Sequence, residues 1–115
     1  MAINFQTANA NALLVAFKKA IDDKHIVTWA CDTDGDFYHT PDQWREAGWL
    51  RPVVYSGQLT MNFLGRKSRK TSKADYGVLH GRFIESMLTH CDELFSNAVA
   101  TSTPTNADMI TTQVA

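Results

Sequence analysis

A short acidic segment carries the side chains whose types and spacing are best suited to chemistry. Asp32, Asp34 and Asp36 alternate around Gly35, and His39 follows shortly after them. Alternating carboxylates can ligate Ca²⁺ or Mg²⁺, and carboxylates beside a histidine can act as general acids and bases. One hypothesis for this protein is therefore a metal-dependent hydrolase that uses residues 32–39.

The same segment also has a purely structural explanation. A calcium loop of the EF-hand type needs glycine at its sixth position and glutamate at its twelfth. Counting from Asp32 places glycine fourth and Gln43 twelfth. Asp34-Gly35 is typical of a two-residue hairpin turn, and in a strand pair the three carboxylates are not expected to converge on one ion. We therefore interpret Asp32, Asp34 and Asp36 as an exposed acidic tip, and we predict no metal and no cofactor.

Other catalytic and metal-binding patterns are missing from the sequence. Its four histidines are scattered, and no HxH, HExxH or GxSxG spacing occurs. Cys31 and Cys91 are far apart and form no CxxC pair, so we expect two buried thiols. The sequence favours a protein that is not an enzyme, and it assigns no catalytic residue.

A basic run provides the second candidate site. Its members, which lie within eight residues that contain no acid, are Arg66, Lys67, Arg69, Lys70 and Lys73. Such a run can bind phosphates, helped by the dipole of a following helix. The net charge of -1, however, is not that of a protein whose whole surface binds nucleic acid. Nucleic-acid binding is accordingly the alternative hypothesis, and an acidic protein would fit the same loop.

The third candidate site is one face of a predicted hairpin in WLRPVVYSGQLTMNFLG, which turns at Ser56-Gly57. Alternation directs Leu50, Val54, Leu59, Met61 and Phe63 to one face. The opposite face then carries Trp49, Arg51, Val53, Tyr55, Thr60 and Asn62. Trp, Tyr and Arg often anchor protein interfaces. We predict that this face binds a protein partner, or a second copy of the chain in a homodimer.

The elements that position these candidates begin with two helical patterns. Apolar residues recur at helical spacing between Phe5 and Asp23, with Thr7 or Asn9 as the N-cap. A longer apolar stripe runs from Tyr76 to Phe95, and the helix is expected to fray near Asn97.

Strands and one further helix are predicted between them. A hairpin across Asp34-Gly35 would place Cys31 opposite Tyr38 and Asp32 opposite Phe37. A short helix would start with Thr40 and Pro41 and stop at Gly48. In the second hairpin, Pro52 suggests an edge strand or a bulge, because proline lacks a backbone donor.

Together, these elements predict an α+β fold. An antiparallel sheet of about four strands, made of two hairpins joined by a short helix, would be packed on one face by the N-terminal and C-terminal helices. Residues 1–97 would form a single domain, and the polar, threonine-rich residues 98–115 would form a disordered tail.

Composition narrows the classes of protein that remain. No apolar run approaches the roughly 20 residues of a membrane helix, and no secretory signal is visible, so we expect no membrane contact and a cytoplasmic location. The leading hypothesis is a small non-enzymatic protein-binding domain of the interaction or inhibitor type. A small protein of this build, without a catalytic signature, would suit a mobile-element inhibitor or an immunity protein.

Overall fold

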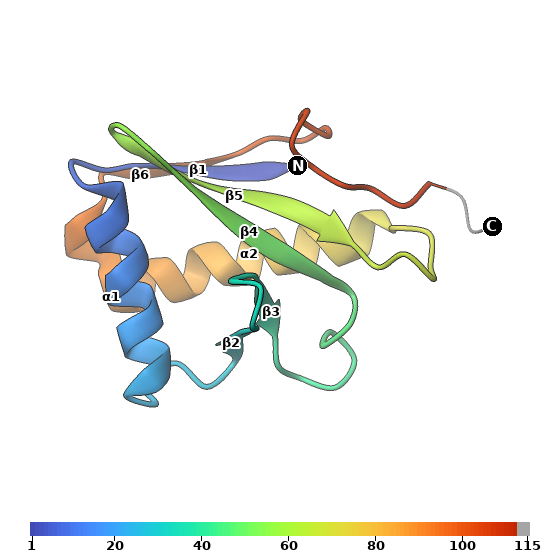
Figure 1. The fold of residues 1–115 in the computed structure, drawn as a ribbon, viewed down its shortest axis with the longest axis horizontal. Coiled ribbons are helices and arrows are strands. Elements are labelled where there is room, and N and C mark those ends of the chain that lie inside the picture. The colour runs from blue at the N-terminus through green and yellow to red at the C-terminus, as the bar shows by residue number, and fades with distance from the viewer. Residues whose placement is uncertain (113–115) are drawn as a thin grey trace.

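The fold is built on an antiparallel sheet. The structure, a computed structural model, describes residues 1–112. The strands are β1 (Ala2–Gln6), β2 (Trp29–Cys31), β3 (Phe37–His39), β4 (Gly48–Tyr55), β5 (Gln58–Gly65) and β6 (Asn97–Ala100). Their order across the sheet is β2-β3-β4-β5-β1-β6, and all neighbours are antiparallel (Figure 1).

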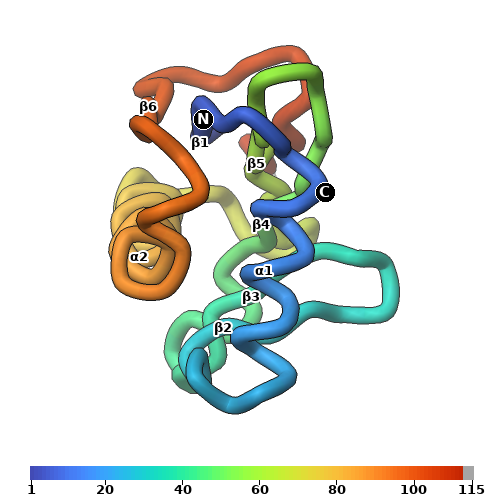
Figure 2. Tube along the Cα trace, turned by 90° about the vertical axis from the view of Figure 1, so that its left-hand side faces the viewer, coloured from blue at the N-terminus to red at the C-terminus, as the bar shows by residue number. Residues whose placement is uncertain are grey.

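Two α-helices accompany the sheet in the described part of the chain. They are α1 (Ala10–Asp22) and α2 (Lys73–Cys91), and a short 3₁₀ turn, η1 (Asp92–Leu94), follows α2 (Figure 2). The predicted α+β class is confirmed, but the prediction of about four strands is wrong, because the sheet formed by residues 1–112 has six. No helix within residues 1–112 is long and apolar enough to cross a membrane.

The first additional strand is β1, at the start of the predicted N-terminal helix. Ile3 and Phe5 alternate with Asn4 and Gln6, and this period of two places the apolar pair in the core beside β5. The helix therefore begins only at Ala10. Its N-cap is Asn9, one of the two predicted caps, whose side chain accepts a hydrogen bond from the backbone of Ala12 at 3.0 Å.

The second hairpin, β4–β5, has the predicted turn and register. Tyr55 pairs with Gln58 across Ser56-Gly57, and Gly57 adopts the positive φ (77°) that the turn demands. Leu50, Leu59, Met61 and Phe63 are fully buried, as expected for the core face, whereas Val54, which was expected to be buried with them, is 46% exposed. The rings of Phe5, Phe17 and Trp29 pack around Phe83 of α2 beneath this face.

Pro52 lies in an internal strand but at a locally free edge. Strand β3 pairs with β4 only through Phe37 and Leu50. The outer side of β4 beyond Leu50 therefore lacks a strand partner within residues 1–112. The missing N–H of proline costs no ladder hydrogen bond there.

The first hairpin has a different register from the predicted one. Cys31 pairs with Phe37, not with Tyr38, and the backbone of Asp32 donates to that of Asp36 at 2.8 Å. The loop is thus one residue longer, with Gly35 at a φ of 85°. The carboxylate of Asp32 stabilises it by accepting hydrogen bonds from the backbone of Asp34 and Asp36, both at 2.9 Å.

The predicted short helix between the hairpins does not form. Residues 41–47 make successive turns, and the hydroxyl of Thr40 donates to the Val27 carbonyl at 2.8 Å, so it caps no helix. Gly48 begins β4 and does not act as a helix stop. A Cβ at Gly48 would lie 2.6 Å from the ring of Phe63, so close packing requires the glycine.

The C-terminal segment also differs from its prediction. Helix α2 ends at Cys91, and β6 pairs with β1 within the region expected to be a disordered tail. The chain then returns beside β5, where the backbone of Met109 donates to Phe63 at 2.9 Å and accepts from Gly65 at 2.6 Å. Residues 113–115 of the predicted tail lie outside the described residues.

One buried carboxylate holds this segment in place. The side chain of Asp108 pairs with the amino group of Met1 and accepts hydrogen bonds from the backbone of Phe63 (2.8 Å) and Thr105 (2.7 Å). Burial alone would raise the pKa of Asp108, but these hydrogen bonds outweigh it and lower the pKa below its usual value. Asp108 is therefore a charged anchor.

We predict that Asp108→Asn lowers the free energy of unfolding by about 3–5 kcal/mol, the usual cost of breaking a buried ion pair. The amino group of Met1 would stay buried without its counter-charge. Urea denaturation of the 115-residue chain measures the change. Ser102→Ala, an exposed position on the same segment, should change the value little. Equal stability of both variants would mean that Asp108 does not anchor the segment.

Candidate functional site

The three candidate sites of the sequence meet at one cavity of about 530 Å³. The acidic tip contributes Asp32, Asp34 and Asp36, the sheet face contributes Trp49 and Arg51, and the basic loop contributes Lys67. The sheet order explains the meeting, because it places the β2–β3 hairpin beside the start of β4 and the end of β5.

Arg51 and Asp36 link the acidic tip to the sheet face. The guanidinium of Arg51 donates from Nε and from a terminal nitrogen to the two carboxylate oxygens of Asp36, both at 2.9 Å. The Asp36 side chain is almost fully buried, so the expectation of an exposed acidic tip is wrong for this residue, whereas the side chain of Arg51 is half exposed. The hydrogen bonds to Asp36 raise the pKa of Arg51. This bidentate pair fixes one wall of the cavity.

The three carboxylates converge, which corrects the expectation that they would not. One oxygen from each of Asp32, Asp34 and Asp36 lies within 4.8 Å of the others. Both oxygens of Asp36, however, already bind Arg51, and one oxygen of Asp32 accepts two backbone hydrogen bonds. A divalent cation would have to compete with a guanidinium that is already in place.

The remaining walls combine an aromatic ring, apolar side chains and one cation. Trp49 is half-buried, and Leu64, Met109 and Ile110 provide apolar surface. Lys67 is exposed. Three carboxylates thus face two cations, Arg51 and Lys67, which leaves one carboxylate in excess. The cavity suits a ligand group that combines positive charge with flat or apolar surface.

The predicted sheet-face residues do share one face, opposite the helices. Arg51 pairs with Asn62, and Val53 pairs with Thr60, so their side chains lie side by side. Tyr55 is half exposed, but Thr60 and Asn62 are 7% and 4% exposed and lie too deep for broad contact with a protein. The face is therefore accessible mainly along β4.

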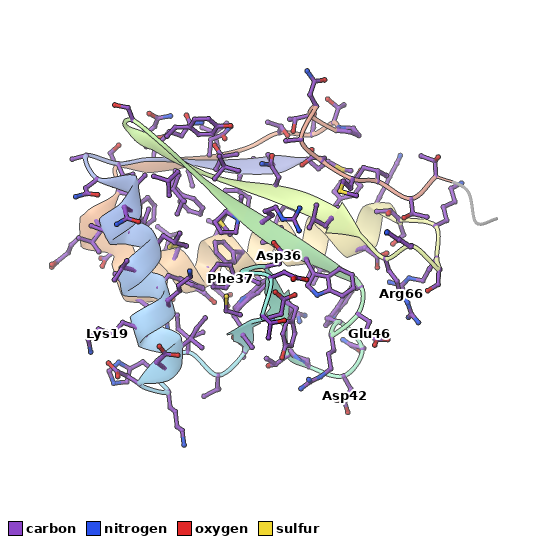
Figure 3. The ribbon with its side chains drawn as sticks, viewed as in Figure 1. Lys19, Asp36, Phe37, Asp42, Glu46 and Arg66 are labelled. Carbon is purple, nitrogen blue, oxygen red and sulfur yellow. The ribbon has the colours of Figure 1, made fainter. Side chains whose placement is uncertain are left out.

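The basic loop is partly neutralised. Arg66 pairs with Glu46 at 3.4 Å, and Figure 3 shows both near one end of the molecule. Arg69 pairs with Asp75 at 2.9 Å, and Asp75 also forms a capping box with Ser72 at the start of α2. Among the described residues, Lys67, Lys70 and Lys73 make no ion pair. The capped helix end offers a phosphate fewer free donors than expected.

His39 does not join the acidic tip. It faces the core from β3, where its ring lies tilted at 34° against that of Trp29 with the ring centroids 4.8 Å apart, whereas Asp36 faces the opposite side of the sheet. Its Nδ1 lies 2.6 Å from the Thr28 carbonyl, and a guanidinium nitrogen of Arg82 lies 3.0 Å from its Nε2. Since arginine can only donate, Nε2 accepts and Nδ1 carries the proton. The proposed hydrolase set is thus divided between two faces.

Sequence reasoning missed two parts of the cavity. Residues 109–111 form one wall, but their polar, proline-interrupted surroundings gave no strand signal. Leu64 was the other omission, and the alternation of the second hairpin, continued by one residue, would have placed it on the same face as Asn62.

No family model, no curated protein and no solved structure matches the chain. What this cavity could bind is therefore argued from the residues that line it.

The buried state of His39 predicts how stability depends on pH. Burial lowers the pKa of His39, and the nearby Arg82 lowers it further, against the opposing effects of Thr28 and Glu85. Burial also lowers the pKa of His80. Near pH 6.5, His39 and His80 therefore bind protons more readily in the unfolded chain than in the folded chain. Stability is fully present above that pH and is lost as the pH falls through it, by up to about 1.4 kcal/mol per pH unit for each histidine.

Urea denaturation between pH 8 and pH 5 measures this slope. His39→Gln should make the profile flatter, whereas His90→Gln, a substitution at an exposed position, is the matched control. A wild-type profile that rises toward acid pH would contradict the assignment of a buried neutral His39.

Proposed function

We propose that this chain is a small, non-enzymatic protein-binding domain that accepts a basic side chain of its partner in the cavity beside Trp49. The observation that carries the proposal is the cavity itself, where the acidic tip, the exposed part of the sheet face and an aromatic wall come together. A partner of this kind fits an interaction or inhibitor protein.

The chemistry of the walls supports a cationic side chain. Neither oxygen of Asp34 accepts a hydrogen bond within residues 1–112, and one oxygen of Asp32 is also free there. A guanidinium can bind such oxygens while its flat face rests on an indole, and tryptophan is the strongest partner for this contact. The exposed residues along β4, Arg51 and Tyr55, then extend the interface beyond the cavity.

The acidic tip has no neighbouring group suited to proton transfer, which supports binding over catalysis. Its nearest titratable partner is Arg51, which cannot give up a proton under ordinary conditions, and His39 lies on the other face. General acid-base catalysis needs a group whose pKa lies near the working pH and that reaches the substrate. The tip is better suited to holding a charge than to moving a proton.

A small analogue tests the cavity directly. Titration with N-acetylarginine amide, followed by ¹H–¹⁵N NMR, should shift the indole signal of Trp49 and the backbone signal of Asp34 in a saturable manner. Asp34→Lys should weaken this binding by about tenfold or more, because it places like charges together. Asp42→Lys makes the same charge change on a turn that Figure 3 shows well away from Asp36, so it should bind normally.

Two results of the same titrations would contradict the proposal. If N-acetylglutamate amide causes the same shifts, or if Asp34→Lys and Asp42→Lys behave alike, the cavity does not select a cation. If Asp34→Lys instead strengthens binding to single-stranded RNA or DNA, and Lys67→Glu abolishes it, the basic loop binds nucleic acid and the alternative hypothesis replaces this one.

The partner itself is sought by affinity capture. A protein that the wild type and Asp42→Lys retain from a cell lysate, and that Asp34→Lys and Tyr55→Glu lose, is the expected result. Light scattering of the purified chain shows whether that partner is a second copy. A dimeric mass that Tyr55→Glu leaves unchanged would remove the sheet face as the dimer interface.

A further inference from the structure

A second cavity lies on the same sheet face and has a different chemistry. It measures about 360 Å³, and its polar lining residues include Asn4, Gln58, Thr60, Asn62 and Asn106, with Tyr55 at its border. No charged side chain is among its lining residues in the described part of the chain. The C-terminal segment contributes Thr105, Asn106 and Ala107 to the lining.

Most of the polar side chains on its floor already have partners. The Asn4 side-chain oxygen accepts hydrogen bonds from the Gln58 amide at 3.1 Å and from the Thr60 hydroxyl at 2.8 Å. Gln58 in turn accepts one from Gln6 at 2.8 Å. This network fixes the orientation of the floor before any ligand arrives, which lowers the entropic cost of binding.

Asn62 is the exception. It is only 4% exposed, yet its side chain makes no hydrogen bond to another residue within residues 1–112. Its amide is not among the described polar atoms that are closed off from solvent without a partner, so solvent reaches the amide at the cavity that Asn62 lines. Because Asn62 lines the cavity, a molecule in the cavity can supply what the protein does not.

The lining defines the chemistry of that molecule. An asparagine amide offers two donors and an acceptor side by side, which complements neighbouring hydroxyl groups. The absence of charged lining residues disfavours an ionic ligand, and the scarcity of apolar side chains, represented by Ala2 and Ala107, disfavours a peptide with apolar anchors. Tyr55 adds an aromatic surface against which a sugar ring can pack.

We infer that this cavity binds a neutral sugar, with Asn62 as the central hydrogen-bonding residue and Tyr55 as the aromatic wall. The two cavities share no lining residue, but Tyr55 also belongs to the sheet face of the proposed protein interface, so Asn62→Ala is the variant that tests the sugar site alone. The two sites lie side by side, since Arg51 of one is paired with Asn62 of the other.

The test uses four neutral sugars as probes: glucose, galactose, mannose and N-acetylglucosamine. In ¹H–¹⁵N NMR titrations at millimolar sugar, at least one should shift the side-chain amide signals of Asn62 and Gln58 in a saturable manner. Asn62→Ala should lower the affinity by about tenfold, equivalent to the loss of one or two hydrogen bonds. Asn11→Ala, on an exposed position of α1, should leave it unchanged.

A second variant keeps the test valid in case Asn62→Ala does not fold. Tyr55 is half exposed, so Tyr55→Ala should keep the wild-type melting temperature while weakening sugar binding. The inference is overturned if none of the four sugars gives a saturable shift, or if Asn62→Ala and Tyr55→Ala both bind like the wild type. It is also overturned if adenosine binds at the site and the sugars do not, because the ligand would then be a heterocycle. Asp34→Lys should retain sugar binding, which separates this result from a failure of the protein-binding proposal.

Discussion

The buried carboxylate of Asp108 is the contact on which both cavities depend. It joins the start of the chain, the end of β5 and the returning C-terminal segment through charge and hydrogen bonds. On one side of it, residues 105–107 form a wall of the uncharged cavity, and on the other, residues 109–111 form a wall of the charged cavity. Backbone hydrogen bonds of Met109 to Phe63 and Gly65 hold the same segment beside β5, and together with Asp108 they keep the wall of both cavities in place. A stability element thus shapes the surface at which we propose that ligands bind.

The sequence predicts those parts of the fold that local patterns determine. The turn at Ser56-Gly57 and the register of β4 with β5 follow from alternation and from the need for positive φ at Gly57. The α2 stripe is similarly clear, although its end was placed too late because Leu94 and Phe95 continue the apolar spacing beyond Cys91. Such signals need only a few neighbouring residues to be interpreted.

The elements that were missed depend on contacts between distant residues. Strand β6, Asn97–Ala100, has no strong alternation and becomes a strand because β1 offers it an edge about ninety positions away. The first hairpin differs by one residue because the Asp32 side chain stabilises a longer loop, an effect that the Asp34-Gly35 signal alone does not reveal. The candidate residues themselves were found from their types, whereas their meeting in one cavity follows from the sheet order.

The pair between Arg51 and Asp36 determines which ligand suits the acidic tip. A divalent cation needs several carboxylate oxygens at once, so it would have to displace a bidentate guanidinium and leave that charge beside the metal. A guanidinium or ammonium group from a partner needs only the oxygens that remain free on Asp32 and Asp34, and it leaves the existing pair intact. The side chain of Trp49 adds a face that favours an organic cation and offers nothing to a hydrated metal ion. The convergence of three aspartates, which first suggested a metal centre, therefore favours recognition of a basic side chain.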